Sequence, residues 1–333
     1  MTKTVWMIII GVLFALIILI FTQFNSNNNK NQNGREPNKK IGILQISQHP
    51  ALDTARSGII KELEKHSNVS FVYECANGDA VMATQIAQKF LQQKSSVIVT
   101  LGTVASQAVA FKIKNNPGIS LVFSSVTDPI SAGLVRDPNK PDSNITGVTD
   151  FVAPLHTIKF IKKVTPNTAR IGVIYNPGEP NSVALIEELE NVAKSEGVLL
   201  IKGIANSTGD VMSATQSIVN KVDVLLVDND NTALSALQSI IKVGDQNNIP
   251  VFCSDIDAMG TGILAAVGPD QFEIGEKAGA MVIDILQGTE VKKLPVFVPG
   301  LDNLQMRVSK SVAARLGIDL SKLQSDKEVI LES

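Results

Sequence analysis

Short apolar runs alternate with amphipathic stretches from residue 41 to residue 286, and this alternation constrains the fold more than any other feature of the chain. The first run, Ile41–Ile46 (IGILQI), is typical of a buried strand, and the stretch after it has the apolar spacing of a helix. Alternation of this kind predicts an α/β fold with parallel, doubly wound sheets. The strands are expected at 41–46, 69–75, 97–101, 121–124, 170–175, 199–204, 222–227 and 250–253, and the helices near 52–66, 80–93, 104–114, 181–196, 210–220, 234–247 and 272–286.

The pattern restarts halfway along the chain, where Arg170–Tyr175 (RIGVIY) resembles the opening strand. A chain of 333 residues also exceeds the size at which a single hydrophobic core stops growing. Two similar lobes are therefore predicted within a body at 41–323, followed by a tail at 324–333. Lobe 1 is expected to cover about 41–152 and lobe 2 about 153–268, each completed by part of the C-terminal region.

Residues 1–24 predict a signal-anchor helix that crosses a membrane. Val5–Phe21 has no charged or polar side chain, and with the residues up to Phe24 it reaches the ~20 residues needed to cross a hydrocarbon core. The long apolar run and the lack of a small-residue cleavage site favour an uncleaved anchor, with cleavage as the alternative. No cysteine follows the run, which argues against a lipid anchor. Residues 25–40 are polar and rich in Asn, and they predict a flexible linker.

The charge distribution agrees with this division of the chain. Residues 1–40 carry five basic side chains against one acidic, a net of +4, so the total of −2 leaves −6 for the other 293 residues. Lys3 favours an N-terminus in the cytoplasm, although the basic residues of the linker compete with it. The body is expected outside the cytoplasm, anchored to the cytoplasmic membrane. A mildly acidic body argues against a nucleic-acid partner.

Composition excludes further classes of function. The two cysteines, Cys75 and Cys253, are too few for a zinc cluster or a disulfide scaffold, and no metal site is predicted. A sugar cleft walled by aromatic rings is disfavoured, because the chain has one Trp and two Tyr and the Trp lies in the anchor. No phosphate-binding loop, H-E-x-x-H motif or G-x-S-x-G elbow occurs, so no catalytic residue and no cofactor is predicted and an enzyme is disfavoured.

Candidate binding residues follow the predicted strands, since open parallel sheets bind ligands outside the carboxyl ends of their strands. Thr103 follows Gly102 at a strand end and opens a helix, where its hydroxyl and the free helix amides suit a carboxylate-sized anion. An ordinary helix cap is the alternative for Thr103. Ser125 and Thr127 follow the next strand, and their hydroxyls either bind a ligand or organise the Asp-Pro turn.

In the second half of the chain, the predicted strands are followed by acidic and amide side chains. Asp228 follows a predicted strand, where its carboxylate suits an ammonium group. A metal cation is disfavoured there because the spacing of a calcium-binding loop is missing. Tyr175 either faces a cleft or packs in the core. Asn181 or Ser182 is expected to cap a helix. Among the three histidines, His49 lies at a strand end and is the candidate for a ligand contact.

The ordered set of strand-end motifs resembles a family of bacterial ABC-transporter substrate-binding proteins, over roughly 41–323. The motifs are Q-x-x-x-H-P-x-L-D from Gln45, G-T-x-A-x-Q-A from Gly102, V-T-D-P from Val126, N-I-T-G-V from Asn144, I-G-V-I-Y-N-P-G-E-x-N-S from Ile171 and D-N at Asp228. Better-described members bind tryptophan and related amino acids. The resemblance implies a type I periplasmic-binding-protein architecture: two Rossmann-like lobes, joined by three crossovers, that close on the ligand by hinge motion.

The resemblance also assigns roles to the strand-end residues. Thr103, Ser125 and Thr127 would hold a ligand carboxylate from the first lobe. The second lobe would line the cleft with Tyr175, Glu179, Asn181, Ser182, Asp228 and Asn229, with Asp228 meeting the α-ammonium. The segment 254–257 departs from the family pattern by carrying two acids, and Asp255 is a second candidate for the ammonium group.

The chain is therefore predicted to be a membrane-tethered, monomeric binding protein for an amino acid-like zwitterion, with an aromatic amino acid such as tryptophan favoured. The apolar part of the ligand would meet Tyr175, Phe123, Phe151 or His49. The expected partners are an importer's permease and its separate ATPase. The alternatives are a membrane-tethered sensor of the same fold without transport and, less favoured, an enzyme that uses the cleft.

Overall fold

The computed structural model describes residues 39–114 and 116–333. The predicted anchor at 1–24 and nearly all of the predicted linker at 25–40 lie outside the described residues. Within the described ranges, no helix is long and apolar enough to cross a membrane.

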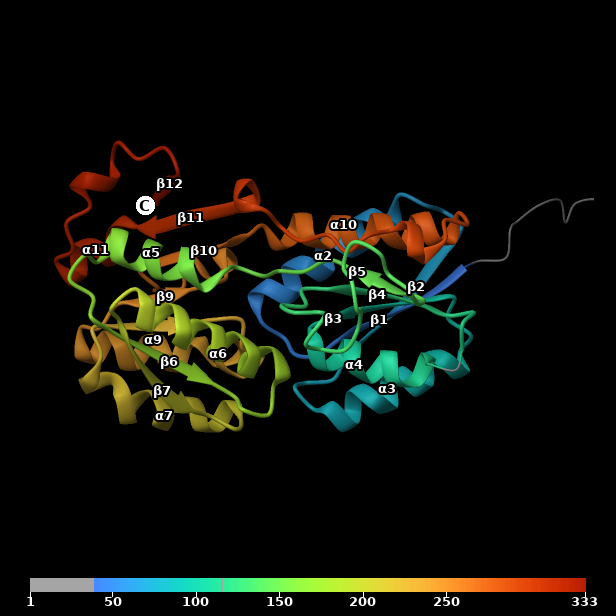
Figure 1. Cartoon of the computed structure of the whole chain (residues 1–333), viewed down its shortest axis with the longest axis horizontal. Helices are drawn as coiled ribbons and strands as arrows, with labels where there is room; N and C mark the ends of the chain where they lie inside the picture. The colour runs from blue at the N-terminus through green and yellow to red at the C-terminus, as the bar shows by residue number, and fades with distance from the viewer. Residues whose placement is uncertain (1–38, 115) are drawn as a thin grey trace, which may run out of the picture. The chain divides into compact units, whose positions relative to one another are not determined.

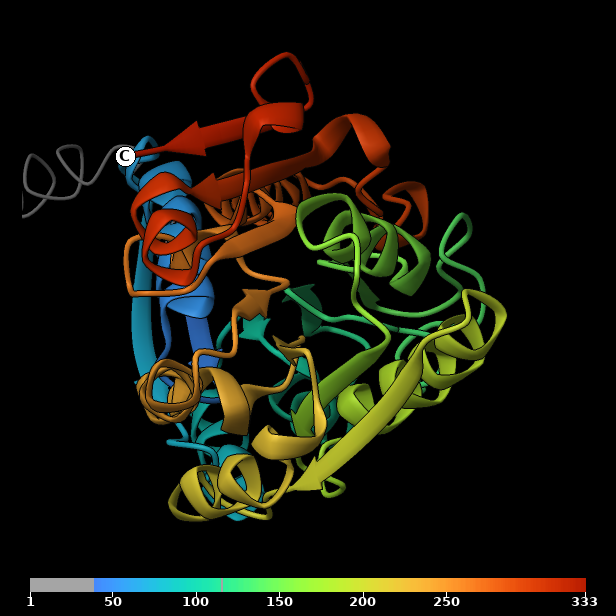
Figure 2. The same ribbon diagram turned by 90° about the vertical axis from the view of Figure 1, so that its left-hand side faces the viewer.

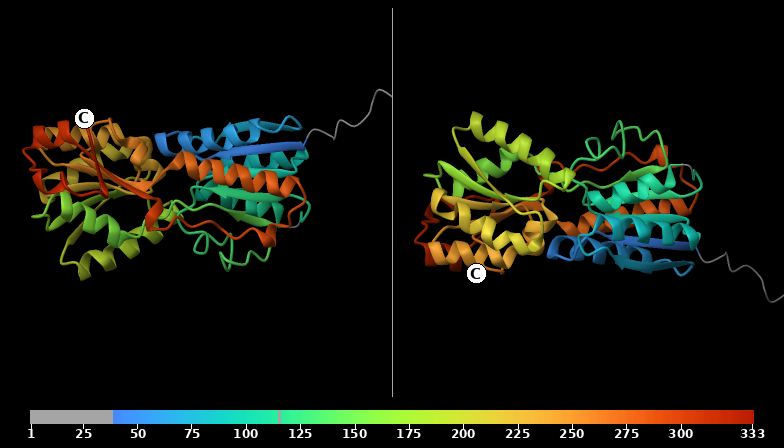
Figure 3. Two further views of the ribbon diagram at one scale, coloured as in Figure 1. Left: turned by 90° about the horizontal axis from the view of Figure 1, so that it is seen from above. Right: turned by 90° about the horizontal axis from the view of Figure 1, so that it is seen from below.

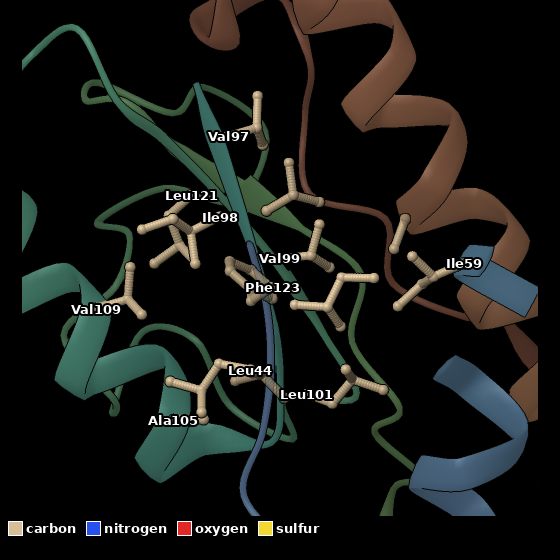
Figure 4. Close-up of a cluster of buried hydrophobic side chains, with 14 of the residues drawn as sticks. Leu44, Ile59, Val97, Ile98, Val99, Leu101, Ala105, Val109, Leu121 and Phe123 are labelled. Atoms are coloured by element: carbon tan, nitrogen blue, oxygen red, sulfur yellow. The ribbon is translucent and has the colours of Figure 1, made fainter. Parts of the chain in front are cut away.

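Lobe 1 is built on a parallel sheet in the order β2-β1-β3-β4-β5. Its strands are β1 (Lys39–Gln45), β2 (Val69–Cys75), β3 (Val97–Leu101), β4 (Ser120–Ser124) and β5 (Ile145–Gly147). Helices α2 (Pro50–Glu64) and α10 (Gln271–Leu286) lie on one side of this sheet, and α3 (Ala80–Gln92) and α4 (Thr103–Ile113) lie on the other (Figure 1). Because both faces are covered, the inner strands are apolar almost throughout; Ile98, Val99 and Phe123 are fully buried between the layers (Figure 4).

Lobe 2 is built on a larger sheet in the order β12-β11-β10-β9-β8-β6-β7. The strands are β6 (Arg170–Tyr175), β7 (Leu199–Ile204), β8 (Val224–Val227), β9 (Val251–Cys253), β10 (Ala265–Pro269), β11 (Leu304–Ser309) and β12 (Val329–Glu332). The helices are α5 (Pro154–Val164), α6 (Pro180–Ser195), α7 (Val211–Ile218), α8 (Asn231–Ser235), α9 (Leu237–Asn247) and α11 (Lys310–Leu316). Figure 2 looks onto this lobe and shows the red strands β11 and β12 together at one edge of the sheet.

The structure corrects three expectations about these elements. The sheets are not wholly parallel, because β10 and β11 pair antiparallel. Residues 329–332 belong to the body rather than to a tail, since β12 pairs with β11. β5 and α5 were not expected: β5 has three residues, too few to show an alternating pattern, and α5 opens with a proline, which suits the first turn of a helix.

The chain passes between the lobes at three places in the described residues: between β5 and α5, between β10 and α10, and between residue 297 and β11. The first and third connections run side by side, because Thr149 N–H donates to Phe297 O at 2.9 Å and Phe297 N–H donates to Gly147 O at 3.0 Å. Figure 3 shows these connections from two further sides. The expected three crossovers are therefore present, and they place α10 in lobe 1 and β11, α11 and β12 in lobe 2.

Two glycines bring α10 unusually close to α2. A Cβ added to Gly275 would lie 1.9 Å from the backbone oxygen of Ala55, and one added to Gly58 would lie 2.2 Å from the backbone oxygen of Phe272. The backbones are thus in direct contact, and no larger side chain fits between them. This contact fixes the start of α10, which follows a crossover, against the helix that follows β1.

Candidate functional site

The polar strand ends of the two lobes meet in a shared cleft. His49, after β1 in lobe 1, hydrogen-bonds through Nε2 to Asn231 Oδ1 of lobe 2 at 3.2 Å. Beside this contact, the Ser235 hydroxyl of α8 donates to the backbone oxygen of Gln48 at 3.5 Å. These bonds bring together residues that are nearly two hundred positions apart in the sequence.

Thr103 lies at the lobe 1 side of the cleft as the first residue of α4 and is 2% exposed. The preceding Gly102 has φ 90°, and a Cβ there would lie 2.6 Å from the Ile46 side chain and 3.7 Å from Asn231 Oδ1. Glycine is required at this position for both reasons. It brings the start of α4 close to the opposite lobe, and it caps α4 without a side-chain hydrogen bond.

Ser125 and Thr127 lie beside this helix start, and both are nearly buried. Ser125 has the left-handed φ of 52°, which costs free energy for a residue with a Cβ and aims its hydroxyl at Gln271 Oε1, 3.0 Å away at the start of α10. The Thr127 hydroxyl donates to Asp150 Oδ1 at 3.3 Å. Both hydroxyls therefore contact crossover segments rather than only their own turn.

Asp228 and Asn229 follow β8 in lobe 2. The side-chain amide of Asn229 donates to the Asp150 backbone oxygen at 3.3 Å, while its oxygen accepts from the Ser254 hydroxyl at 2.7 Å. The Asn181 amide donates to the Asn229 backbone oxygen at 2.7 Å. Asn229 thus joins β8, β9 and the first crossover, and Asp228 is held beside them.

Glu179 lines the cleft, and its carboxylate is bonded within lobe 2. The carboxylate accepts four hydrogen bonds, of 2.6 to 3.0 Å, from the backbone and side chains of Asn231 and Thr232. These bonds hold the first turn of α8 and orient the Asn231 side chain toward His49. The expectation that Asn181 or Ser182 caps a helix is wrong, because α6 begins at Pro180 and Glu179 stands at the cap position. The Ser182 hydroxyl instead donates to Asp230 Oδ2 at 2.6 Å.

Three carboxyl groups in the cleft are buried and form no salt bridge with a described residue. Burial raises the pKa of Asp150 and of Asp228 to about 6, and the charge of Asp228 also raises the pKa of Asp150. Burial, with the nearby Asp257 and Asp150 charges, raises the pKa of Asp255 to about 7. In the described residues, no lysine or arginine forms a salt bridge with any of the three.

Several buried polar atoms in this region have no hydrogen-bond partner in the described chain. They are Ser47 Oγ, His49 Nδ1, Thr149 Oγ1, Asn181 Oδ1, Asp255 Oδ2 and Asp257 Oδ2. Five of these residues follow strands or lie in a crossover, and Asn181 lies in the first turn of α6. Buried polar groups are normally paired, so a concentration of unpaired ones at the strand ends indicates a place where a polar ligand binds.

Two cavities flank the hydrogen-bonded centre of the cleft, and each has walls from both lobes. The first has a volume of about 250 Å³ and is lined by Thr127, Phe151, Asn181 and Leu185, among others. The second, of about 450 Å³, is lined by Ser47 and Gln48 from lobe 1 and by Glu179 and Asn231 from lobe 2.

The structure places the aromatic candidates Phe123, Phe151 and Tyr175 in different surroundings. Phe123 is fully buried in the core of lobe 1, with its ring 2.5 Å from a Cβ added to Gly147, so it does not reach the cleft and its expected contact with a ligand is wrong. Phe151 is half-buried and lines the 250 Å³ cavity. Tyr175 is half-buried, packs against the core of lobe 2 and adjoins Asp228.

The sequence-based reasoning missed Asp150, Asn231 and Gln271. Asp150 follows the three-residue strand β5 in N-I-T-G-V-T-D, so the missed strand hid a strand-end acid. Asn231 ends the run DNDN, of which only the first two residues were selected. Gln271 opens α10 after a crossover, and only the three-dimensional path of the chain brings it to Ser125.

Within the described residues, no group of three or more His, Cys, Asp or Glu side chains is arranged to hold a metal ion. Cys253 is buried, Cys75 is half-buried, and both are free thiols. Burial raises the pKa of Cys253 well above its usual value.

Two lobes joined by three crossovers, with unpaired polar groups at facing strand ends, define a two-lobed ligand-binding protein. The profile of the family described as "ABC transporter substrate binding protein" matches residues 40–327. The chain belongs to this family, as its motifs predicted. A tyrosine-binding protein of Clostridioides difficile (strain R20291) is 34% identical to it over 340 residues, which cover 99% of this chain and 96% of the relative.

Solved structures agree with this assignment. A conserved domain protein from Vibrio cholerae is 34% identical with a TM-score of 0.83, and the match covers 89% of this chain and all of that one. An ABC domain in complex with L-Trp, from Streptococcus pneumonia, is 29% identical with a TM-score of 0.81, and the match covers 88% of this chain and all of that one. A substrate-binding protein with adhesive properties from Clostridium difficile, in its ligand-free, open form, is 31% identical with a TM-score of 0.65; the match covers 89% of this chain and 99% of that one.

Proposed function

We propose that this protein binds an amino acid with an aromatic side chain between its lobes and delivers it to the permease of an ABC importer. The observation that carries this proposal is the group of buried carboxyls with raised pKa values, Asp150, Asp228 and Asp255, which have no cationic partner in the described chain. A buried carboxylate is costly unless a cation pairs with it. An α-ammonium group supplies such a cation, and Asp228 is the residue proposed to meet it.

A carboxylate fits the opposite side of the cleft. Gly102 starts α4 without a side-chain cap, and the first N–H groups of a helix favour an anion. The hydroxyls of Thr103, Ser125 and Thr127 lie around this helix start and are proposed to donate to the ligand carboxylate. Each hydroxyl has one hydrogen, so Ser125 and Thr127 would release their bonds to Gln271 and Asp150 when the ligand binds. A zwitterion therefore matches both sides at once, whereas a sugar would supply hydroxyl donors and no cation for the three carboxyls.

The comparisons support an aromatic amino acid as the ligand. One relative carries the name tyrosine-binding protein, and another was solved in complex with L-Trp. The ligand-bound relative also has a higher TM-score than the ligand-free, open one at about the same identity. This supports an arrangement of the lobes close to the closed, ligand-bound form.

Transport and attachment to the membrane complete the proposal. An importer's permease and ATPase are the partners that the family name implies. The apolar run Val5–Phe21 has the length to anchor the chain in the cytoplasmic membrane, with the lobes outside and residues 25–40 as the linker. The lobes are proposed to act as a monomer.

Isothermal titration of the full-length protein with L-tyrosine and L-tryptophan tests the ligand class. Saturable binding with one site per chain is expected, and D-tyrosine and N-acetyl-L-tyrosine should bind far more weakly because they displace or neutralise the ammonium group. Equal binding of N-acetyl-L-tyrosine would contradict the proposed role of the carboxyls.

A further inference from the structure

The 250 Å³ cavity has features of a side-chain pocket. Its walls come from lobe 1 at 127–130, from α6 of lobe 2 at 181–188, and from two crossovers at Phe151 and Val298. It therefore exists only when the lobes lie against each other. Its volume is below the roughly 300–1,000 Å³ of sites for drug-sized ligands, which suits part of a small molecule.

The inner part of the cavity adjoins the residues proposed to hold the ligand's zwitterionic end. Thr127 lines it and donates to Asp150, and Asn181 lines it and donates to the Asn229 backbone. Two polar atoms of the lining, Thr149 Oγ1 and Asn181 Oδ1, are buried with no partner in the described residues; Thr149 is 1% and Asn181 is 5% exposed. A molecule held at the strand ends can extend from there into this cavity.

The walls between the two ends are apolar. Pro129 and Leu185 are buried, Phe151 is half-buried, and Ile130 and Val298 are exposed at the rim. Contacts of this kind suit a flat ring, since the face and edge of an aromatic side chain bury a large apolar area.

Two carboxylates of opposite lobes, Asp128 and Glu188, also line the cavity. The charge of Glu188 contributes to the raised pKa of Asp228, so Glu188 lies within electrostatic reach of the residue proposed to meet the ammonium group. Asp128 is already occupied, because it accepts from the N–H groups of Ile130 and Ser131 at 2.9 and 3.0 Å and from the Ser131 hydroxyl. Partial burial and the charge of Asp128 raise the pKa of Glu188. Glu188 has no hydrogen bond or salt bridge to another described residue, so its carboxylate oxygens are free to accept a hydrogen bond from a ligand.

We propose that this cavity holds the ligand's side chain and that Glu188 is a specificity residue, which selects aromatic side chains that end in a hydrogen-bond donor. The phenol hydroxyl of tyrosine and the indole N–H of tryptophan are such donors, and phenylalanine has none. The inference rests on the proposed function, because it assumes an amino acid in the cleft. A cationic side chain is the competing occupant, since its apolar stem would also suit these walls and its charge would suit Glu188; L-lysine is therefore included in the test.

The test compares L-tyrosine, L-tryptophan, L-phenylalanine and L-lysine by isothermal titration on the full-length protein. The wild type should bind tyrosine or tryptophan about tenfold or more tighter than phenylalanine, because phenylalanine cannot donate the charge-assisted hydrogen bond to Glu188. Glu188→Leu should bring this ratio down to about twofold or less, and Glu188→Gln, which keeps an acceptor oxygen, should retain most of it. Glu187→Leu, at the neighbouring exposed position outside the cavity lining, is the matched control and should leave the ratio unchanged.

The outcomes separate the two proposals. A ratio that stays the same in Glu188→Leu, in a protein that binds aromatic amino acids, overturns the assignment of Glu188 and leaves the proposed function intact. L-Lysine as the tightest ligand overturns the selection of neutral donors. If the wild type binds none of the four amino acids, both proposals fail. Thermal unfolding of each variant checks that Glu188→Leu is folded, which is expected because the residue is exposed.

Discussion

His49 Nε2 and Asn231 Oδ1 form a hydrogen bond of 3.2 Å that joins the two lobes across the cleft. Burial lowers the pKa of His49 to about 4, so the imidazole is neutral near pH 7. Asn231 is held in place by the Glu179 carboxylate, which accepts from both its backbone and side-chain amides. A buried acid in lobe 2 thus orients the amide that contacts lobe 1, and we expect this contact to favour the arrangement in which the lobes lie against each other.

Asn231→Ala should weaken ligand binding by about 0.5–1.5 kcal/mol, because it removes the hydrogen bond between the lobes and leaves the buried His49 ring unpaired. Isothermal titration measures the affinity, and small-angle scattering of the ligand-free protein should give a larger radius of gyration for the variant. Gln216→Ala, at an exposed amide of α7, is the control. Identical affinities and radii for the two variants would contradict the role of this contact.

Asp228→Asn should weaken amino acid binding by about 2–5 kcal/mol, since the buried ammonium group loses its charged partner. The same change should leave the ligand-free protein at least as stable at pH 7.5, because a buried carboxylate without a cation is replaced by a neutral amide that still accepts from the Asn229 N–H. Titration and thermal unfolding give the two readouts. Asp284→Asn, on the exposed side of α10, should change neither; a variant that binds as tightly as the wild type sinks the assignment of Asp228.

The stability of the ligand-free protein should fall as pH rises from about 4 to about 7. The folded-state pKa values of Asp150 and Asp228 are about 6 and that of Asp255 is about 7, all above the ordinary value of 3.8. In this window these carboxyls, together with Asp230 and Asp257 whose pKa values are also about 6, bind more protons in the folded protein than in the unfolded chain. The lowered pKa of His49 offsets only one of these groups, so each rise in pH favours unfolding, by up to about 1.4 kcal/mol per group and pH unit. Denaturant unfolding between pH 4 and pH 8 measures this slope.

Amino acid affinity should change in the opposite direction, because an ammonium group pairs with ionised carboxyls. Binding is expected to strengthen from pH 5 to pH 7.5 and then to level off. An affinity that falls across this range would show that the three carboxyls do not act as the cation partner.

Gly275→Ala should destabilise the protein by about 1–3 kcal/mol, since its Cβ would lie 1.9 Å from the Ala55 backbone oxygen and force α10 away from α2. Gly118→Ala, where nothing lies within 4 Å of the added Cβ, is the matched control. Equal unfolding midpoints for the two variants would contradict the close packing of these helices.

Most strands and helices of this fold were predictable, and the exceptions have a physical reason. Strands 97–101 and 170–175 have the predicted bounds, because strands covered on both faces are nearly continuous apolar runs bounded by polar turns. β5 and β12 were missed; they have three and four residues and lie at the edges of their sheets, whereas the equally short β8 and β9 are inner strands and were predicted. The antiparallel β10–β11 pair depends on the path of the third crossover, which local sequence does not encode.

The candidate site was predictable as a location and less so in its contacts. The rule that ligands bind at strand ends selected Thr103, Ser125, Thr127 and Asp228, which the structure brings to facing sides of one cleft. The bonds that Glu179 makes within lobe 2 depend on the pairing of β6 with β8, and the contacts of Asp150 and Gln271 with hydroxyls of lobe 1 depend on crossovers that join distant parts of the chain. Patterns within one strand and its turn contain no information on such pairings.

Native mass spectrometry of the freshly purified full-length protein tests the central claim most directly. The account predicts that a fraction of the wild-type protein carries one added mass equal to an aromatic amino acid. Asp228→Asn should lack this added mass, and wild-type protein from which the ligand has been removed should regain it when L-tyrosine or L-tryptophan is added. A protein that carries no such mass, and that gains none with a large excess of either amino acid, would contradict the account.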